Sequence, residues 1–291
     1  LIILHDYYMQ NGNLDYLKEQ REYVDGAVRQ IDAIVREDGT LCADEGFLFD
    51  WPSHDSEDEI VGVYALWVLA AKKCRVLFEI LGLDVSVCDH MLEKLSRYQV
   101  PAVKKQKQCE AFLVYAGIKK AEDAYEFLTK DGAKGFSTFL SYYILNSISE
   151  SGHTKEAVEL MKQYYGAMLD LGATTFWEDF DLDWVKNSAP IDRLPKSGER
   201  DIHGDFGKHC YVGFRHSLCH GWSCGPITFL MRTLCGIEIL EPGCKRVRIR
   251  PQSGGLQWYE VSYPTPYGTI GISYKDDKFD VKVPEGVCVE K

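Results

Sequence analysis

Most of the chain has the pattern of helices joined by short turns, and this pattern limits the folds that it can adopt. Apolar residues recur at helical spacing, and we expect helices at 14–35, 86–98, 106–116, 120–129, 137–150, 154–169 and 223–235. Short loops such as "LGLDVS" and "ESGHTKEA" connect several of them, which predicts stacked helical hairpins. No strict repeat is present, so a solenoid of identical units is not supported, and a closed helical toroid remains open.

One further helix stands out because it is apolar nearly all round. Ser56 and Glu59 form a capping-box pattern ahead of the run "IVGVYALWVLAA", and the helix is expected to continue to about Leu81, with Gly82 as its C-terminal stop. A helix without a polar side belongs in a protein interior, so we expect this one to be deeply buried. The apolar run, 60–71, is too short to cross a bilayer.

The pattern changes near the end of the chain, after "LEPGCK". The last segment alternates apolar and polar residues, is rich in Val, Ile and Tyr, and carries turn signals at "SGG", "PYG" and "KDDK". This predicts a small antiparallel β module. We therefore expect a mainly α chain with a β tail, divided into a helical domain at 1–240 and a β domain at 241–291.

The charge of the chain limits the classes of partner that it can bind, and its cysteine content indicates its compartment. The chain has 33 Lys and Arg against 44 Asp and Glu, a formal net charge of −11, which disfavours nucleic acid and anionic membranes as partners. The ten cysteines are scattered and none is spaced CxxC, which favours free thiols in a reducing compartment over a disulfide framework. The sequence thus predicts a cytoplasmic enzyme, with a periplasmic or secreted location as the alternative.

Three stretches combine aromatic rings, carboxylates and histidines at points where the helical pattern stops. The first is "ADEGFLFDWPSHDSEDE", with Asp50 and Trp51; the second is "LGATTFWEDFDLDW", with Trp177 and Glu178; the third is "FRHSLCHGWSCGP". The third contains the candidate residues His216, His220 and Trp222. Loops at one end of a helical scaffold are a common place for a site. The Gly- and Pro-rich segment 184–215 is expected to be a long loop, either functional or disordered.

Aromatic faces beside carboxylates suit a sugar. Pyranose C–H faces pack on rings, hydroxyls bond to carboxylates and His, and cleavage of a glycosidic bond takes two carboxyl groups. An aromatic neighbour also raises the pKa of a carboxyl by excluding water. Structural alternatives stay open: Glu178 as an exposed neighbour of core aromatics, and Asp50–Trp51 as a capped turn. His216 and His220 as metal ligands, or Cys219 as a nucleophile, lack a third partner.

These residues together resemble the bacterial α-L-rhamnosidases, family 78 of the glycoside hydrolases. "GATTFWEDFD" resembles the family's Gly-Ala-Thr-Thr-x-Trp-Glu motif, and "HSLCHGWSCGP" resembles its Ser-x-Asn-His-x-x-x-Gly segment. "FDWP" is similar to its Gly-Asp-Trp loop. "GIEILEPGCKRVRIRP" and "TPYGTIGISY" are similar to the entry and a hairpin of its C-terminal β domain. The resemblance covers most of the chain, with the motifs in the expected order.

The resemblance implies an (α/α)6 barrel followed by a β-sandwich domain, and inverting hydrolysis of terminal α-L-rhamnosides without a metal or organic cofactor. It makes Glu178 the general base. His220, Trp177, Asp50 and Trp51 would line the rhamnose subsite, and His216 and Trp222 are further candidate substrate-binding residues from the same motif.

Two departures from the family pattern matter. The motif that carries the family's general acid precedes the "DYY…GN" helix and is not found here, so we expect an N-terminal part of the barrel to be missing. Cys219 also replaces the family's Asn before the His. The alternatives are another helical-toroid carbohydrate enzyme, such as a uronyl hydrolase or a lyase that recruits Arg215, and a non-catalytic sugar-binding relative.

Overall fold

The computed structural model describes residues 1–42, 47–54, 56–206 and 216–290. Asp55, Cys210 and Arg215 lie outside the described residues. The chain forms two compact units. Unit 1 consists of Leu1–Phe47, Val63–Ala102 and Cys235–Lys291; unit 2 consists of Leu48–Gly62 and Val103–Leu234.

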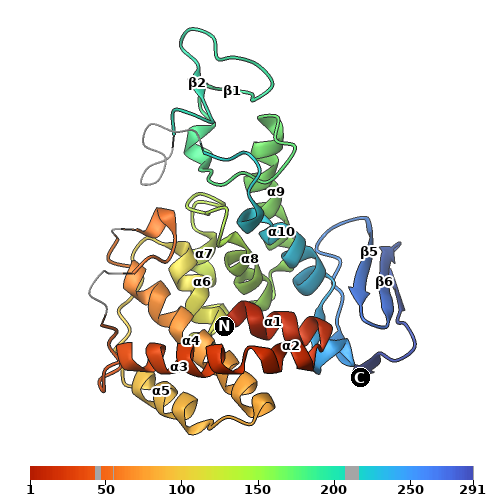
Figure 1. Cartoon of the computed structure of the whole chain (residues 1–291). Helices are drawn as coiled ribbons and strands as arrows, with labels where there is room; N and C mark the ends of the chain where they lie inside the picture. The colour runs from red at the N-terminus through yellow and green to blue at the C-terminus, as the bar shows by residue number, and fades with distance from the viewer. Residues whose placement is uncertain (43–46, 55, 207–215, 291) are drawn as a thin grey trace. The chain divides into compact units, whose positions relative to one another are not determined.

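Helices are the main regular structure of both units (Figure 1). They are α1 (Ile2–Asn11), α2 (Leu14–Glu19), α3 (Arg21–Ile34), α4 (Glu59–Leu81), α5 (Ser86–Ser96), α6 (Lys107–Tyr115), α7 (Ala121–Thr129), α8 (Ser141–Glu150), α9 (Thr154–Asp170) and α10 (Gly225–Thr228). Each helix expected from the sequence is present, with two changes. The helix expected at 14–35 is divided at Gln20 into α2 and α3. The one expected at 223–235 is α10 followed by a π-helical turn, Phe229–Leu234.

Helix α4 is buried as expected, but it does not begin as expected. Only Lys72 and Glu79 of its residues are exposed. At its C-terminus Gly82 has a φ of +60°, and Leu83 N–H donates to Phe78 O at 2.8 Å, so the glycine stops the helix. The predicted capping box is wrong, because the Glu59 carboxylate accepts the Phe49 N–H at 3.0 Å instead of reaching back to Ser56.

The strands of unit 1 form two three-stranded sheets. One contains β3 (Ile237–Ile239), β4 (Arg246–Ile249) and β8 (Cys288–Glu290); the other contains β5 (Trp258–Thr265), β6 (Gly268–Lys275) and β7 (Lys278–Lys282). The β tail is confirmed, although β4 and β8 pair in parallel and β3 precedes 240–245. Asp276 and Asp277, with φ of 51° and 58°, make the tight turn expected at "KDDK".

The first helix of the chain packs on these C-terminal strands within unit 1. Gln10 donates from Nε2 to Pro264 O at 2.9 Å, and the Tyr263 hydroxyl donates to Gln10 Oε1 at 2.5 Å. Gly12 ends α1 with a φ of +69°, and a Cβ there would lie 3.0 Å from the Cα of Gly243. The division into domains at 1–240 and 241–291 stays a prediction.

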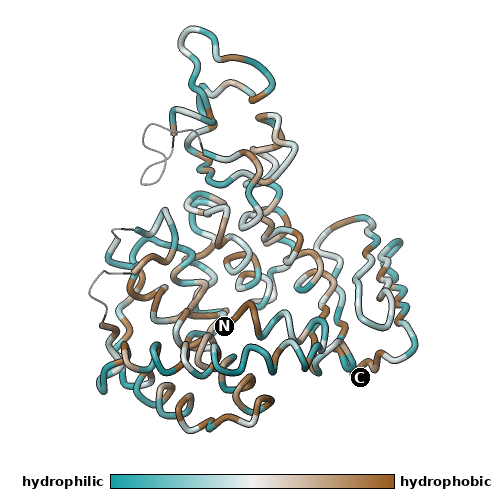
Figure 2. Tube along the Cα trace, in the orientation of Figure 1, coloured by the Kyte–Doolittle hydropathy of each residue, from teal (hydrophilic) through white to brown (hydrophobic). Residues whose placement is uncertain are grey.

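Unit 2 is built on helices α6 to α9, which pack against one another, with α10 against α8. The segment that follows α9 is mostly irregular and includes a two-residue parallel pair, β1 (Ser188–Ala189) with β2 (Arg200–Asp201). Its trace alternates between hydrophilic and hydrophobic residues (Figure 2). No helix of the described residues is long and apolar enough to cross a membrane.

Candidate active site

Two segments distant in sequence run side by side in unit 2 and hold the candidate base. Glu178 N–H donates to Ser217 O at 2.9 Å, and His220 N–H donates to Phe176 O at 2.8 Å. The hydroxyl of Thr175 donates to Leu218 O in the same ladder. The second and third sequence motifs are therefore brought together by backbone pairing, which fixes their side chains relative to each other.

The carboxylate of Glu178 is held from one side and open on the other. Its Oε2 accepts the Ser217 N–H at 2.8 Å, while Oε1 lies 3.9 Å from Nδ1 of His220. The side chain is 16% exposed, against 33% for His220. One oxygen is thus fixed by the backbone, and the other faces a partly open space beside an imidazole. A carboxylate in this arrangement can accept a proton from a bound water.

The backbone of Glu178 is fixed as firmly as its side chain. Its carbonyl oxygen accepts two hydrogen bonds, from the Thr138 hydroxyl at 2.6 Å and from Trp222 Nε1 at 2.8 Å. On the preceding residue, Ser223 donates to Trp177 O at 2.5 Å. Thr138 lies in the α7–α8 connection and carried no recognisable signal in the sequence, so sequence reasoning missed its part in holding the base.

A wall of aromatic rings stands beside the carboxylate. The indole of Trp222 stacks on Phe139, with centroids 5.1 Å apart, and lies 4.5 Å from the His220 ring. The ring of Trp51 lies 6.4 Å from that of Trp222. Phe139 is exposed and both indoles are partly exposed, so apolar ring surface is available to a ligand. Phe139 was not predicted as a site residue.

Asp50 lies in the interior behind Trp51. It is 4% exposed, and its Oδ1 caps the turn Trp51–Ser53 by accepting the Trp51 N–H at 2.9 Å. Burial raises its pKa to about 7, an effect that the Ser137 hydroxyl opposes and the Asp179 charge reinforces. The structural alternative named for Asp50, a capped turn, is therefore present.

Asp179, next to Glu178, is a second carboxyl of this region and is half-buried. Burial raises its pKa to about 6; the hydrogen bond from Phe180 N–H opposes the rise, and the charges of Asp181 and Glu178 add to it. Near neutral pH both Asp50 and Asp179 thus carry protons for part of the time. The sequence placed Asp179 among the acids of this stretch without giving it a role.

Two predicted site residues lie in the core. Trp177 is fully buried and packs edge-on against Phe180 at 5.7 Å, so it presents no surface to a sugar. His216 is 1% exposed and lies among the rings of Trp184, at 6.1 Å, and His203, at 5.2 Å. The expectation that these two residues contact substrate is at odds with their burial. The described residues include no cluster of three His, Cys, Asp or Glu side chains suited to a metal.

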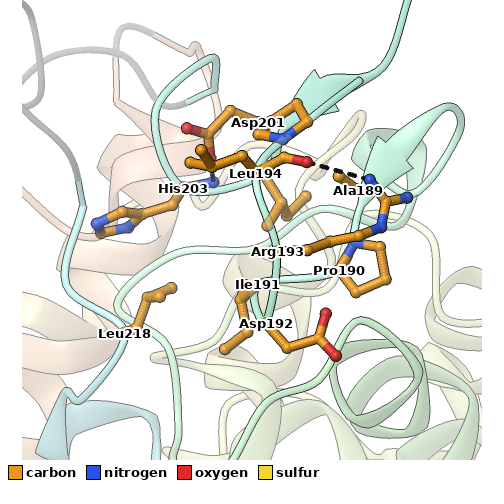
Figure 3. Close-up of a pocket in the computed structure, with 11 residues that line it drawn as sticks. Ala189, Pro190, Ile191, Asp192, Arg193, Leu194, Asp201, His203 and Leu218 are labelled. Carbon is orange, nitrogen blue, oxygen red and sulfur yellow. Dashed lines mark hydrogen bonds between the residues drawn. The ribbon is translucent and has the colours of Figure 1, made fainter. Parts of the chain in front are cut away.

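A cavity of about 310 Å³ opens in the segment after α9 (Figure 3). It is lined by Ala189–Pro195, Asp201–His203 and Leu218. The guanidinium of Arg193 binds Glu199 through two hydrogen bonds of 2.5 and 2.6 Å, which closes this loop on itself and lowers the pKa of Glu199 to about 2. Leu218 joins the cavity to the segment that holds Glu178. The described part of the segment is therefore a mostly irregular loop that lines a cavity, and a functional role for it stays a prediction.

Comparison with known proteins finds similarity to α-L-rhamnosidases, in sequence near the C-terminus and in fold over the chain. Residues 236–290 match the bacterial α-L-rhamnosidase C-terminal domain. A family 78 rhamnosidase of Bacillus sp. GL1 has a similar structure, with a TM-score of 0.74 and 20% identity over 99% of this chain and 32% of that one. The α-L-rhamnosidase of Aspergillus terreus has a TM-score of 0.74 and 18% identity, over 99% of this chain and 35% of that one.

A third similar structure is the Streptomyces avermitilis α-L-rhamnosidase complexed with L-rhamnose, with a TM-score of 0.71 and 16% identity over 97% of this chain and 28% of that one. The chain spans about a third of the length of these enzymes. None of the curated proteins matches it in sequence. Its fold over nearly the whole length is that of the C-terminal part of a family 78 α-L-rhamnosidase, and its residues 236–290 match that family's C-terminal domain.

Proposed function

We propose that the chain is the base-bearing part of an inverting glycoside hydrolase that removes terminal α-L-rhamnose, with Glu178 as the general base. One observation carries the proposal: the Glu178 carboxylate is fixed by the Ser217 N–H on one oxygen and faces His220 with the other. A fixed carboxylate beside exposed aromatic rings is what activation of water against a bound sugar requires. The likeness in fold to α-L-rhamnosidases supports the choice of sugar.

In this proposal the apolar face of the rhamnose packs on Trp222, with Trp51 at its edge, and His220 bonds a hydroxyl. Asp50 does not contact the sugar but positions Trp51, because its carboxyl caps the turn that carries Trp51. Trp177 supports the site from the core. The chemistry needs only carboxyl groups and water. The proton for the leaving oxygen comes from a second carboxyl group, which the family resemblance assigns to a motif other than those found here.

The test uses p-nitrophenyl α-L-rhamnoside, because a good leaving group needs little help from an acid and reports mainly on the base. We expect the wild type to release p-nitrophenol and Glu178→Gln to be slower by about 10²- to 10⁴-fold. The variant should bind L-rhamnose as the wild type does. Glu159→Gln, which removes an exposed carboxylate on α9 of the same unit, is the matched control and should keep full activity.

Product stereochemistry separates inversion from retention. An inverting enzyme releases the β-anomer of rhamnose first, which proton NMR detects before mutarotation. First release of the α-anomer would refute the role of Glu178 as a base. Binding of rhamnose without turnover in the wild type would favour the non-catalytic sugar-binding relative. Turnover of an unsaturated uronyl substrate alone would favour the uronyl hydrolase.

A further inference from the structure

A second cavity in unit 2 has a composition that its surroundings do not explain. It measures about 280 Å³ and lies between the start of α6 and the α7–α8 connection. Its lining consists of Lys104, Lys105, Lys107, Phe127, Lys130, Asp131, Lys134 and Gly135. Five lysines thus face one acid, in a chain whose formal net charge is −11. Clustering of like charge costs free energy, so a compensating anion is the natural occupant.

Acidic side chains offset only part of this charge. Lys134 pairs with Asp183 at 2.7 Å and Lys104 pairs with Glu57, but all four side chains are more than half exposed, so both pairs are weak and exchangeable. No ion pair within the described residues neutralises Lys105 or Lys130. Within the part of the chain that the structure describes, these two lysines are therefore available to an incoming anion without an ion pair having to break.

One of the five lysines that line the cavity, Lys107, is buried. Lys107 is 6% exposed, and its Nζ donates to the carbonyl oxygens of Lys130 and Gly132, both at 2.6 Å. Its Nζ also lies 5.5 Å from the centre of the Phe136 ring. Burial lowers the pKa of Lys107 to about 8, with the Asp131 charge opposing that effect. An ammonium removed from water is stabilised by any anion that reaches it.

The backbone around these lysines is fixed. The Asp58 carboxylate accepts three consecutive N–H groups, those of Lys104, Lys105 and Gln106, at 2.9, 2.7 and 2.9 Å. This clamp sets the direction in which the first lysines leave the chain. A site whose backbone is held before a ligand arrives loses less entropy on binding.

The cavity shares its supporting segments with the candidate active site. Gln106, beside Lys105, donates from its side chain to Pro52 O at 2.9 Å, and Pro52 follows Trp51. On the other side, the segment that carries Lys134 continues to Thr138, which bonds the carbonyl oxygen of Glu178. Both walls of the lysine cavity therefore lead within a few residues to the aromatic rings or to the base.

We propose that this lysine cavity binds a carboxylate or sulfate group on the glycan whose terminal rhamnose enters the active site, so that the substrate is an acidic glycan. The inference rests on the proposed function. It explains why a chain with a formal net charge of −11 gathers five lysines around one cavity. Charge-assisted bonds to ammonium groups supply affinity, and the place of the cavity selects glycans with an anionic sugar near the rhamnose.

The first test measures binding by calorimetry at constant ionic strength, with glucuronate, inorganic sulfate and glucose as probes. We expect glucuronate to bind the wild type and glucose not to bind. The double variant Lys105→Gln/Lys130→Gln should weaken glucuronate binding by about tenfold or more, since each charge-assisted bond contributes measurably. The matched control, Lys162→Gln/Lys278→Gln, removes two exposed lysines that do not line the cavity and should change binding by less than about twofold.

The sulfate probe distinguishes a carboxylate from a sulfate group as the anion that the cavity binds. Binding of both probes, weakened together by the double variant, supports a site for an acidic group on a glycan. Binding of sulfate without binding of glucuronate overturns the assignment to a glycan carboxylate. A sulfate ester on the glycan is then the remaining assignment. Methyl glucoside 6-sulfate, used as a third probe, supports that assignment if it binds and overturns it if it does not. Equal binding of glucuronate by wild type and double variant overturns the proposal, and circular dichroism checks that the variants fold.

Kinetics then connect the cavity to the active site. The KM for an α-L-rhamnosyl-glucuronate disaccharide should rise about tenfold in the double variant, while KM and kcat for p-nitrophenyl α-L-rhamnoside stay unchanged. An equal rise for both substrates would overturn the proposal, because a neutral substrate does not engage the lysines. If neither substrate is cleaved, the proposed function fails, and the calorimetry still decides whether the cavity binds acidic sugars.

Discussion

Glu178 and Asp50 are two carboxyl groups of the same unit in contrasting environments. Glu178 is partly exposed, receives one backbone N–H and faces an imidazole. Asp50 is enclosed behind Trp51, and burial raises its pKa to about 7. The contrast shows how one chemical group serves two purposes: exposure with a fixed donor suits a base that must meet water, and enclosure suits a carboxyl that caps a turn in the core. Three predictions test this division.

The largest effect is expected from shortening the base. Glu178→Asp keeps the charge but withdraws the carboxylate by one methylene, so it can no longer accept the Ser217 N–H and align a water at the same time. A displacement of about 1 Å at a reacting group costs on the order of 100-fold in rate, and we expect kcat to fall by that factor. The melting temperature should barely change. A variant that keeps more than about a tenth of the wild-type kcat would argue that Glu178 has no positional role.

The next prediction concerns the stability of the protein as pH rises. The pKa of Asp50 is raised in the folded state, so the folded protein holds its proton after the unfolded chain has released it. Its contribution to stability is complete below pH 4 and is lost as pH rises towards 7. Asp50→Asn should therefore lose less free energy of unfolding between pH 5 and 8 than the wild type, by about 2 kcal/mol.

Urea unfolding at the two pH values measures this difference. Asp179 stays in the variant and, with a pKa of about 6, contributes a loss in the same pH range, so the variant should keep a smaller slope and not a flat profile. Identical slopes for wild type and variant would mean that Asp50 is charged throughout and that its enclosure has no effect on its protonation.

The smallest effect is expected from a change that leaves both carboxyl groups in place. Trp222→Phe keeps an aromatic ring against Phe139 but removes the Nε1 donor to Glu178 O. We expect a loss of about 1 kcal/mol in stability, the usual contribution of one hydrogen bond, and a several-fold lower kcat. Chemical denaturation and steady-state kinetics measure the two quantities. A fall in kcat as large as that of Glu178→Asp would place Trp222 in the chemical step itself.

The local parts of the fold were predictable from the sequence. Helical spacing and a glycine stop located α4, and two aspartates in "KDDK" located a tight hairpin turn, because these features depend on neighbouring residues. The Ser56–Glu59 capping box failed because Phe49, ten residues before Glu59, supplied a competing donor. The break at Gln20 carried no glycine or proline to mark it.

Some members of the candidate site were predictable from the sequence, but their arrangement was not. Glu178 and His220 were both recognised, yet nothing in the spacing between them indicates that the backbone of 175–178 pairs with that of 217–220. Trp177 and Trp222 occupy similar places in the sequence, because Trp177 is next to Glu178 and Trp222 is two residues after His220. Only the packing of Phe180 and Phe139 decides that the first indole is in the core and the second is at the surface.

The paired backbones of Glu178 and Ser217 have a consequence for how such a protein can diversify. They form a neck, a short stretch of hydrogen-bonded backbone, at which the intervening chain leaves and returns, with the core residues Phe180 and His216 next to its two ends. Doubling the length of a closed flexible loop costs only about 0.6 kcal/mol, so insertions, deletions or a grafted loop there should leave the base in register. The sequence of the neck must therefore be conserved to keep the base in place, whereas exposed parts of the loop, such as 192–200, can vary in sequence and length.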